Sequence, residues 1–125
     1  MLFVGIDSVE INRIEKAMKN PRFCQRVFGE AENSLLAMRG FSAESAAACF
    51  CAKEAFSKAM GTGIRGFRLC EVELLRDELG APYLKLSGNA LKMALEKGLR
   101  FSVSVTHTKE LATVIVIGEK EEVAL

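Results

Sequence analysis

The chain has 125 residues, of which half are hydrophobic. It can therefore form one domain spanning residues 1–125, but it is too short for two ordinary domains. Seventeen Lys and Arg residues nearly balance sixteen Asp and Glu residues, and this balance gives no argument for a nucleic-acid-binding protein. No apolar run approaches the ~20 residues of a membrane span, so we expect neither nucleic acid nor membrane as a partner.

The N-terminal run from Met1 to Asp7 is apolar but has no basic leader, and we therefore expect no signal peptide. The four cysteines form no C-x-x-C pair, and a single histidine is too few for a Cys/His zinc site. We interpret these cysteines as small buried residues of a cytoplasmic protein, where thiols stay reduced.

Residues 2–7 are predicted to form a buried strand with an acid at its tip. Ser8 is then expected to cap a helix from Val9 to Met18, which ends at Asn20-Pro21. Short helices follow over residues 22–28 and 30–39, because a glycine comes directly after each of them.

Ser42 is expected to cap the longest helix, which runs to Met60 and contains three consecutive alanines. In the helix predicted after Ser87, Leu91, Ala94 and Leu95 are expected to face inward. The remaining predictions are strands over residues 69–75, 83–86, 101–106 and 111–117, that helix over 88–97, and a solvated charged tail from Glu119 to Glu122.

This order of elements predicts an α+β fold. Several strands are consecutive or nearly so, which favours hairpins and a mainly antiparallel sheet over a doubly wound parallel one. We expect this sheet to pack against a long central helix and several shorter helices.

The run from Ala52 to Ile64 is the most informative part of the sequence. It predicts a helix that carries Lys53, Glu54 and Lys58 and ends at Gly61-Thr62-Gly63. Glycines let backbone N–H groups approach an anion and lysine supplies positive charge, so the lysines and the glycines are a candidate phosphate site. A helix C-cap followed by a turn is the simpler interpretation of the glycines alone.

Two carboxylates are candidate metal ligands. Asp7 ends an apolar strand, and Glu54 lies on a helix that is apolar over much of its circumference. Together they suit Mg²⁺, which proteins hold through one or two carboxylates while phosphates and water complete the shell. The alternatives are a helix-capping role for Asp7 and a surface ion pair between Glu54 and Lys58.

Two further groups of polar residues have both a structural and a functional interpretation. Ser102, Ser104 and Thr106 share one strand face, and His107 follows them at the strand end, where a ligand could reach it. The simpler interpretation is a solvent-facing surface. Likewise, Arg13, Arg22 and Arg26 either serve solubility or form a docking surface for an acidic partner.

These residues together resemble the small bacterial 4′-phosphopantetheinyl transferases, the holo-[acyl-carrier-protein] synthase family. The resemblance covers nearly the whole chain, and its most specific part is the Lys-Glu-Ala signature paired with an N-terminal Gly-Ile-Asp. The matching segments are Gly5-Ile6-Asp7, Val9 to Ile11, Arg13-Ile14, Phe23, Arg26 to Phe28, Glu32, Phe50 to Ala59, Gly61 to Gly63, Gly80, Pro82, Leu86 to Gly88 and Ser102 to Thr108.

The resemblance implies a transferase that moves the 4′-phosphopantetheine arm of coenzyme A to a serine of apo acyl carrier protein. It would release 3′,5′-ADP in a Mg²⁺-dependent step that supports fatty acid biosynthesis. Asp7 and Glu54 match the family's metal ligands, and with Lys58 they are the expected catalytic residues. The expected coenzyme A contacts are Lys58, Gly61, Thr62, Gly63, Pro82, Thr106 and His107.

The resemblance also implies a homotrimer with active sites between neighbouring subunits. Arg13, Arg22 and Arg26 would then dock the acidic carrier protein. The base that accepts the serine proton is left open between Glu54 and a Mg²⁺-bound water.

One position departs from the family pattern. Family members often carry Arg before the signature Phe, where this chain has Cys49, and Arg39 and Arg65 are the candidates to replace its charge. The departure is the one argument for a non-catalytic nucleotide-binding or scaffold protein on the same fold. A transferase that serves a different carrier domain is the second alternative.

Overall fold

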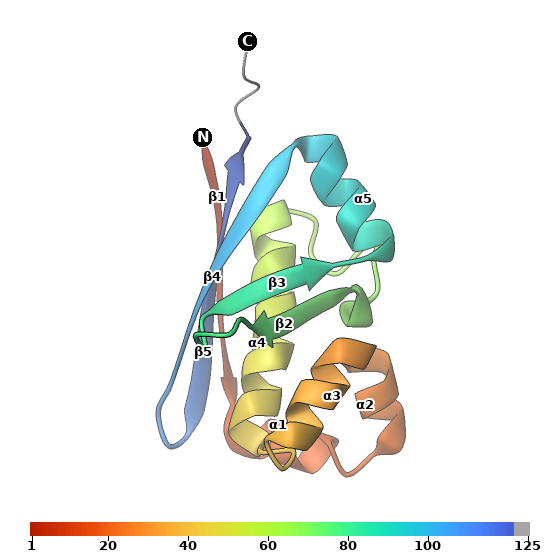
Figure 1. The fold of residues 1–125 in the computed structure, drawn as a ribbon, viewed down its shortest axis with the longest axis vertical. Helices are drawn as coiled ribbons and strands as arrows, with labels where there is room; N and C mark the ends of the chain where they lie inside the picture. Colours follow the sequence, from red (N-terminus) through yellow and green to blue (C-terminus); the bar gives the residue numbers. More distant parts are fainter. Residues whose placement is uncertain (122–125) are drawn as a thin grey trace.

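The computed structural model describes residues 1–121. Strand β1 is followed by three short helices, the long helix α4, a two-stranded hairpin, helix α5 and a final pair of strands (Figure 1). The bounds are β1 Leu2–Glu10, α1 Ile11–Ala17, α2 Pro21–Val27, α3 Glu30–Met38, α4 Ala43–Met60, the 3₁₀ turn η1 Leu69–Glu71, β2 Val72–Arg76, β3 Pro82–Leu86, α5 Gly88–Lys97, β4 Leu99–His107 and β5 Leu111–Lys120.

Helix α4 lies between two antiparallel sheets. One face of the helix packs on the three-stranded sheet, whose order is β1-β5-β4, and the β2–β3 hairpin crosses its other side (Figure 1). Buried alanines at 46, 47, 48, 52, 55 and 59 allow this close approach. The α+β fold with a long central helix is thus confirmed, and all strand pairs are antiparallel.

Most predicted helices and strands are confirmed, including the capping of α4: the Ser42 hydroxyl accepts a hydrogen bond from the Ser45 N–H at 3.2 Å. Ser102, Ser104 and Thr106 share one exposed face of β4 as predicted, while the alternating apolar residues Phe101, Val103 and Val105 are half-buried. Within the described residues, no helix is both long and apolar enough to cross a membrane.

The prediction of a buried strand over residues 2–7 with an acid at its tip is partly wrong: Leu2, Val4 and Ile6 are more than half exposed, and Asp7 lies within the strand. The prediction for residues 8–10 is also wrong. Strand β1 continues to Glu10, paired with Leu111, and α1 begins only at Ile11. Ser8 therefore caps no helix, and its hydroxyl lies 2.7 Å from that of Thr113 on the central strand β5. The strand continues because pairing with β5 satisfies backbone groups that a helix would otherwise have used.

Two more local predictions are wrong. Residues 69–71 form a 3₁₀ turn rather than strand, because the buried Glu71 carboxylate accepts backbone N–H groups of Arg68 and Ala90. In α5, Ala94 is buried as predicted, but Leu91 is 40% exposed and Leu95 71% exposed. Of the charged tail, Glu119 and Lys120 belong to β5, and Glu122 lies outside the described residues.

Gly5 sets the distance between β1 and α4. A Cβ added there would lie 1.9 Å from the Ala55 carbonyl oxygen and 2.6 Å from the Ala59 nitrogen, both of them backbone atoms. Backbone in a packed helix cannot move aside as a side chain can, so the strand and the helix can meet only because position 5 has no side chain.

We expect Gly5→Ala to lower the free energy of unfolding by about 1–3 kcal/mol or more, the usual range for overpacking a core. Urea denaturation followed by circular dichroism measures the change. Gly118→Ala is the matched control, since its added Cβ would meet the side chain of Phe101, a ring that can shift. An equal or larger loss in the control would contradict the role assigned to Gly5.

Candidate active site

Asp7 lies on the edge strand β1, on the sheet face that α4 covers. Its carboxylate accepts a hydrogen bond from the Lys58 ammonium at 3.0 Å and one from the Cys51 thiol at 3.5 Å. The side chain is 20% exposed, so solvent reaches it from one side. The structure thus places Asp7 against the signature helix, as a shared site requires, and excludes the helix-capping alternative.

Glu54 lies near Asp7, and its electrostatics show this. Burial raises the pKa of Glu54, and the negative charge of Asp7 raises it further, while the charges of Lys58 and Arg13 oppose that rise. A carboxylate whose charge is disfavoured by burial and by a second negative charge attracts a cation. Within residues 1–121 no group of three His, Cys, Asp or Glu side chains forms a metal cluster, so the donor set here is a pair of carboxylates.

Lys58 pairs with Asp7 rather than with Glu54. Its Nζ also donates to the carbonyl oxygen of Ile6 at 3.0 Å, and the side chain is 53% exposed. No Glu54–Lys58 ion pair occurs in the described part of the chain, so the surface ion-pair alternative is wrong. The ammonium bridges strand and helix and remains open to an anionic ligand.

The glycine turn follows one helical turn after Lys58. Gly61 caps α4 with φ +77° and Gly63 has φ +61°, conformations that favour glycine. A Cβ at either position would meet nothing within 4 Å, and the Thr62 hydroxyl donates to the Gly63 carbonyl oxygen at 2.9 Å. The turn is therefore both a helix cap and an open surface beside a lysine.

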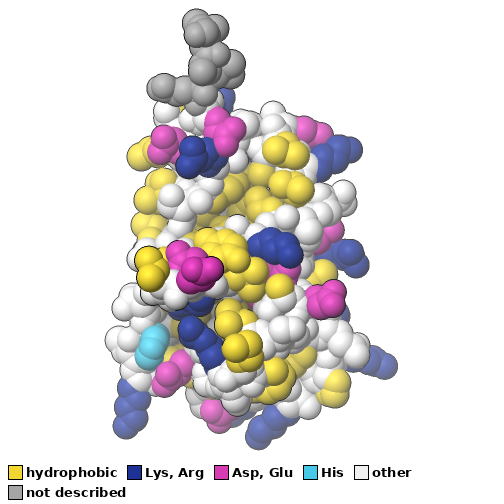
Figure 2. All heavy atoms as spheres, viewed as in Figure 1, with side chains coloured by type: hydrophobic (Ala, Val, Ile, Leu, Met, Phe, Trp, Pro, Cys, Tyr) yellow, Lys and Arg dark blue, Asp and Glu magenta, His cyan; other side chains and the backbone are white. Residues whose placement is uncertain are grey.

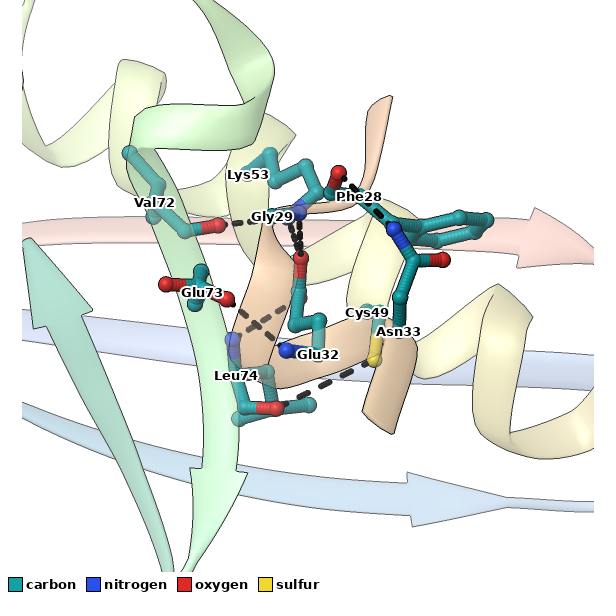
Figure 3. A network of polar contacts seen from close by, with 9 residues as sticks. All are labelled: Phe28, Gly29, Glu32, Asn33, Cys49, Lys53, Val72, Glu73 and Leu74. Atoms are coloured by element: carbon teal, nitrogen blue, oxygen red, sulfur yellow. Dashed lines mark hydrogen bonds and ion pairs between the residues drawn. The ribbon is translucent and has the colours of Figure 1, made fainter. Parts of the chain in front are cut away.

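Lys53 does not belong to this surface, and its prediction as a phosphate ligand is wrong. Its side chain is fully buried and its Nζ lies 2.6 Å from the Glu32 carboxylate (Figure 3). Sequence reasoning missed this pair. The available signal was a lysine directly after the apolar run from Ala46 to Ala52, which requires either exposure or a buried partner.

Thr106 and His107 lie on β4 and Pro82 lies on β3, whereas the two carboxylates lie on β1 and α4. Thr106 is exposed and pairs with Thr113, and the His107 Nε2 approaches the Glu44 carboxylate at 3.9 Å. Pro82 begins β3 opposite Arg76. No hydrogen bond or ion pair in residues 1–121 joins these three residues to Asp7 or Glu54.

The three arginines are exposed on α1 and α2. Arg13 is close enough to lower the pKa of Glu54 by its charge, so this end of the arginine surface adjoins the carboxylates. Arg26 lines a concave surface with Phe23 and Phe50, and Phe50 precedes Glu54 by one helical turn.

Cys49, which stands where an arginine was expected, is buried. Its thiol donates to the Leu74 carbonyl oxygen at 3.9 Å, and burial raises its pKa far above the ordinary value. Arg39 and Arg76 line the same small cleft as Cys49, whereas Arg65 does not. All four cysteines are free, but only Cys49 and Cys51 are buried, so the burial prediction is wrong for Cys24 and Cys70, which are half-buried.

Residues 3–115 match the family model described as the 4′-phosphopantetheinyl transferase superfamily. The holo-[acyl-carrier-protein] synthase of Alkaliphilus metalliredigens is 44% identical over 87% of this chain and 91% of that protein. The corresponding protein of Lachnoclostridium phytofermentans is also 44% identical, over 95% of this chain and 97% of its own.

Solved structures show the same likeness. The holo-[acyl-carrier-protein] synthase of Neisseria meningitidis has a TM-score of 0.89 at 31% identity, covering 96% of this chain and 100% of that one. The Bacillus anthracis structure, in complex with CoA (3′,5′-ADP), has a TM-score of 0.80 at 33% identity, over 97% and 99% of the two chains. The Helicobacter pylori structure, in complex with coenzyme A, has a TM-score of 0.81 at 28% identity, over 93% and 99%.

Proposed function

Because the chain belongs to the 4′-phosphopantetheinyl transferase superfamily, we propose that the Asp7–Glu54–Lys58 cluster is the centre of its transferase site. The protein transfers the phosphopantetheine arm of coenzyme A to acyl carrier protein, as a holo-[acyl-carrier-protein] synthase does. Coenzyme A is the donor, in line with the complexes of similar structures. The convergence of Asp7 with the signature helix is the observation that carries the assignment of the site.

Asp7 and Glu54 fit a hard divalent cation. The charge of Asp7 raises the pKa of Glu54, and the charges of Lys58 and Arg13 oppose that rise; Lys58 also pairs with Asp7. They would hold Mg²⁺, which when bound neutralises the pyrophosphate of coenzyme A. Two carboxylates are an incomplete ligand set, so we expect tight metal binding only when substrate phosphates complete it.

The remaining residues of the site position coenzyme A and neutralise its negative charge. The exposed Lys58 ammonium offsets charge that develops on the leaving 3′,5′-ADP, and the Gly61-Thr62-Gly63 turn presents open backbone beside it. The acceptor serine oxygen bonds to phosphorus as the bond to the leaving phosphate breaks, and the serine proton passes to a base. Among the described residues Glu54 would serve as that base, and a bound Mg²⁺ would make water an alternative proton acceptor.

We expect Asp7→Asn and Glu54→Gln each to reduce transfer at least ~100-fold with the fold intact, because each removes a charged metal ligand. Mass spectrometry of apo acyl carrier protein incubated with coenzyme A and Mg²⁺ measures the added arm, and circular dichroism measures folding. Glu96→Gln, an exposed carboxylate on α5, is the matched control. Near-normal Mg²⁺-dependent turnover in either ligand variant would refute the metal assignment.

Arg13, Arg22 and Arg26 are proposed to dock an acidic carrier protein. All three are exposed, and Arg13 adjoins the carboxylate pair. Complementary charge across an interface accelerates encounter and fixes orientation. A carrier protein held here would bring its serine toward Asp7 and Glu54.

Charge reversal in Arg13→Glu/Arg22→Glu is expected to raise the KM for the carrier protein ~10-fold or more, while the KM for coenzyme A stays unchanged. Steady-state kinetics at two ionic strengths measures both constants. The control is Lys92→Glu on the exposed side of α5. A carrier KM that is unaltered, with the same salt dependence as the unmodified protein, contradicts the docking surface.

The outer face of the three-stranded sheet is proposed as the interface of a homotrimer. Strand register aligns Val4 with Ile117 and Ile6 with Ile115 on that face, and Val4 and Ile6 are more than half exposed. Hydrophobic side chains line the left edge of the molecule, where these strands run (Figure 2). Apolar sheet surface of this kind is normally covered by another molecule. Active sites between subunits would let Pro82, Thr106 and His107 of one copy serve the carboxylates of the next.

Val4→Glu is expected to convert the trimer to monomer and to lower transfer activity, because it places a charge in an apolar interface. Sedimentation velocity measures the oligomeric state. Leu95→Glu, at an exposed leucine on α5, is expected to leave both properties unchanged. A monomeric unmodified protein with full activity would overturn this part of the proposal.

A further inference from the structure

A buried polar network lies on the side of α4 opposite the sheet. The Lys53 ammonium donates to the Glu32 carboxylate at 2.6 Å and to the Val72 carbonyl oxygen (Figure 3). The second oxygen of Glu32 accepts the Leu74 backbone N–H at 2.8 Å. Both charged side chains have no exposed surface. One lysine thus connects α4 directly to α3 and to β2.

A second carboxylate extends the network. Glu73 on β2 accepts the backbone N–H of Glu32 at 2.8 Å, at the N-terminus of α3, where a negative charge is favourable. Gly29 makes room for it, because a Cβ at Gly29 would lie 2.4 Å from the Glu73 carboxyl carbon. Glu32 in turn accepts the Gly29 N–H at 3.1 Å. Every buried side-chain nitrogen and oxygen in the described residues has a partner.

Such a network is not primarily a source of stability. Burying a lysine and a glutamate costs desolvation energy that their attraction largely offsets, so well-packed apolar residues often serve stability equally well. Burial raises the pKa of Glu32, which is this desolvation acting on the carboxyl group. The hydrogen bonds instead restrict geometry, since each one limits the distance and angle between its donor and its acceptor.

Helix α4 depends on these hydrogen bonds for its orientation about its own axis. Toward the sheet it presents alanines, including Ala52, Ala55 and Ala59. These allow close contact but offer few side-chain ridges that would prevent the helix from rotating. Glu54 is the residue next to Lys53 and lies about 100° further around the helix. At a radius of roughly 5–6 Å, a rotation of about 10° moves its carboxylate by about 1 Å.

We propose that Lys53 and Glu32 are positioning residues for the transferase site. From one side of α4 they fix its rotation about its axis and its position along that axis. This keeps Glu54 and Lys58 close to Asp7 on the other side. Neither touches Asp7 or Glu54 through any hydrogen bond or ion pair in the described chain. A misplacement of 1 Å at a reacting centre can cost ~100-fold in rate. The inference rests on the proposed function of that site.

The test uses the uncharged, nearly isosteric double variant Lys53→Met/Glu32→Gln in the full chain. We expect it to fold by circular dichroism, with kcat reduced at least ~10-fold and the KM for the carrier protein within about twofold of the unmodified value. Mn²⁺ affinity in the presence of coenzyme A, measured by electron paramagnetic resonance, is expected to weaken at least ~5-fold. This second measurement does not depend on turnover.

Glu71→Gln is the matched control, because it also neutralises a buried carboxylate but one that holds α5 rather than α4. It is expected to lower the melting temperature and to leave kcat and Mn²⁺ affinity unchanged. If the double variant does not fold, Glu32→Asp keeps the charge, shortens the reach by one methylene and is expected to shift both readouts in the same direction.

The proposal would be overturned if Lys53→Met/Glu32→Gln or Glu32→Asp folded and kept the kcat and the Mn²⁺ affinity of the unmodified protein. An equal loss of both in Glu71→Gln would also overturn it, because the network would then be merely structural. A failure of the proposed function would look different: the unmodified protein would transfer no phosphopantetheine, while the Mn²⁺ measurement would still compare the variants.

Discussion

Helix α4 meets strand β1 at a distance that leaves no room for a side chain at Gly5. The rest of the structure depends on this contact. It brings the Asp7 carboxylate within hydrogen-bonding distance of Lys58 and Cys51, two residues that lie 51 and 44 positions away in the chain. Small residues on both surfaces make the approach possible, and the β2–β3 hairpin and α3 pack against the helix on the side away from the three-stranded sheet (Figure 1).

The site that results is negative and incomplete by itself. Burial and the charge of Asp7 both raise the pKa of Glu54, while the charges of Lys58 and Arg13 oppose that rise. A donor set of this kind favours a ligand that brings both a cation and further oxygen atoms. A nucleotide pyrophosphate with its metal has that composition, which connects the electrostatics of the cluster with the coenzyme A complexes of similar structures.

Neighbouring residues of the signature segment, Phe50 to Ala59, point toward different sides of helix α4. Successive side chains point about 100° apart, so Lys53 is buried against Glu32 while Lys58 pairs with Asp7, whose charge also acts on Glu54. The two lysines therefore have unrelated surroundings although five positions separate them. Lys53 is fully buried beside an acidic partner, whereas Lys58 is half-exposed beside Asp7.

The sequence by itself determined the helices, the hairpin, the α+β class and the family, because side-chain periodicity and capping are local and the signature motif is contiguous. Only the tertiary structure decided that Lys53 is buried, that Ser8 continues a strand, that Leu91 and Leu95 remain exposed, and that Lys58 pairs with Asp7 rather than with Glu54. Three of these four outcomes, those for Lys53, Ser8 and Lys58, depend on a partner supplied by a distant segment: Glu32 from α3, Thr113 from β5 and Asp7 from β1. Local periodicity indicates which way a side chain points along its own element, but the partner it meets is set by how the elements pack.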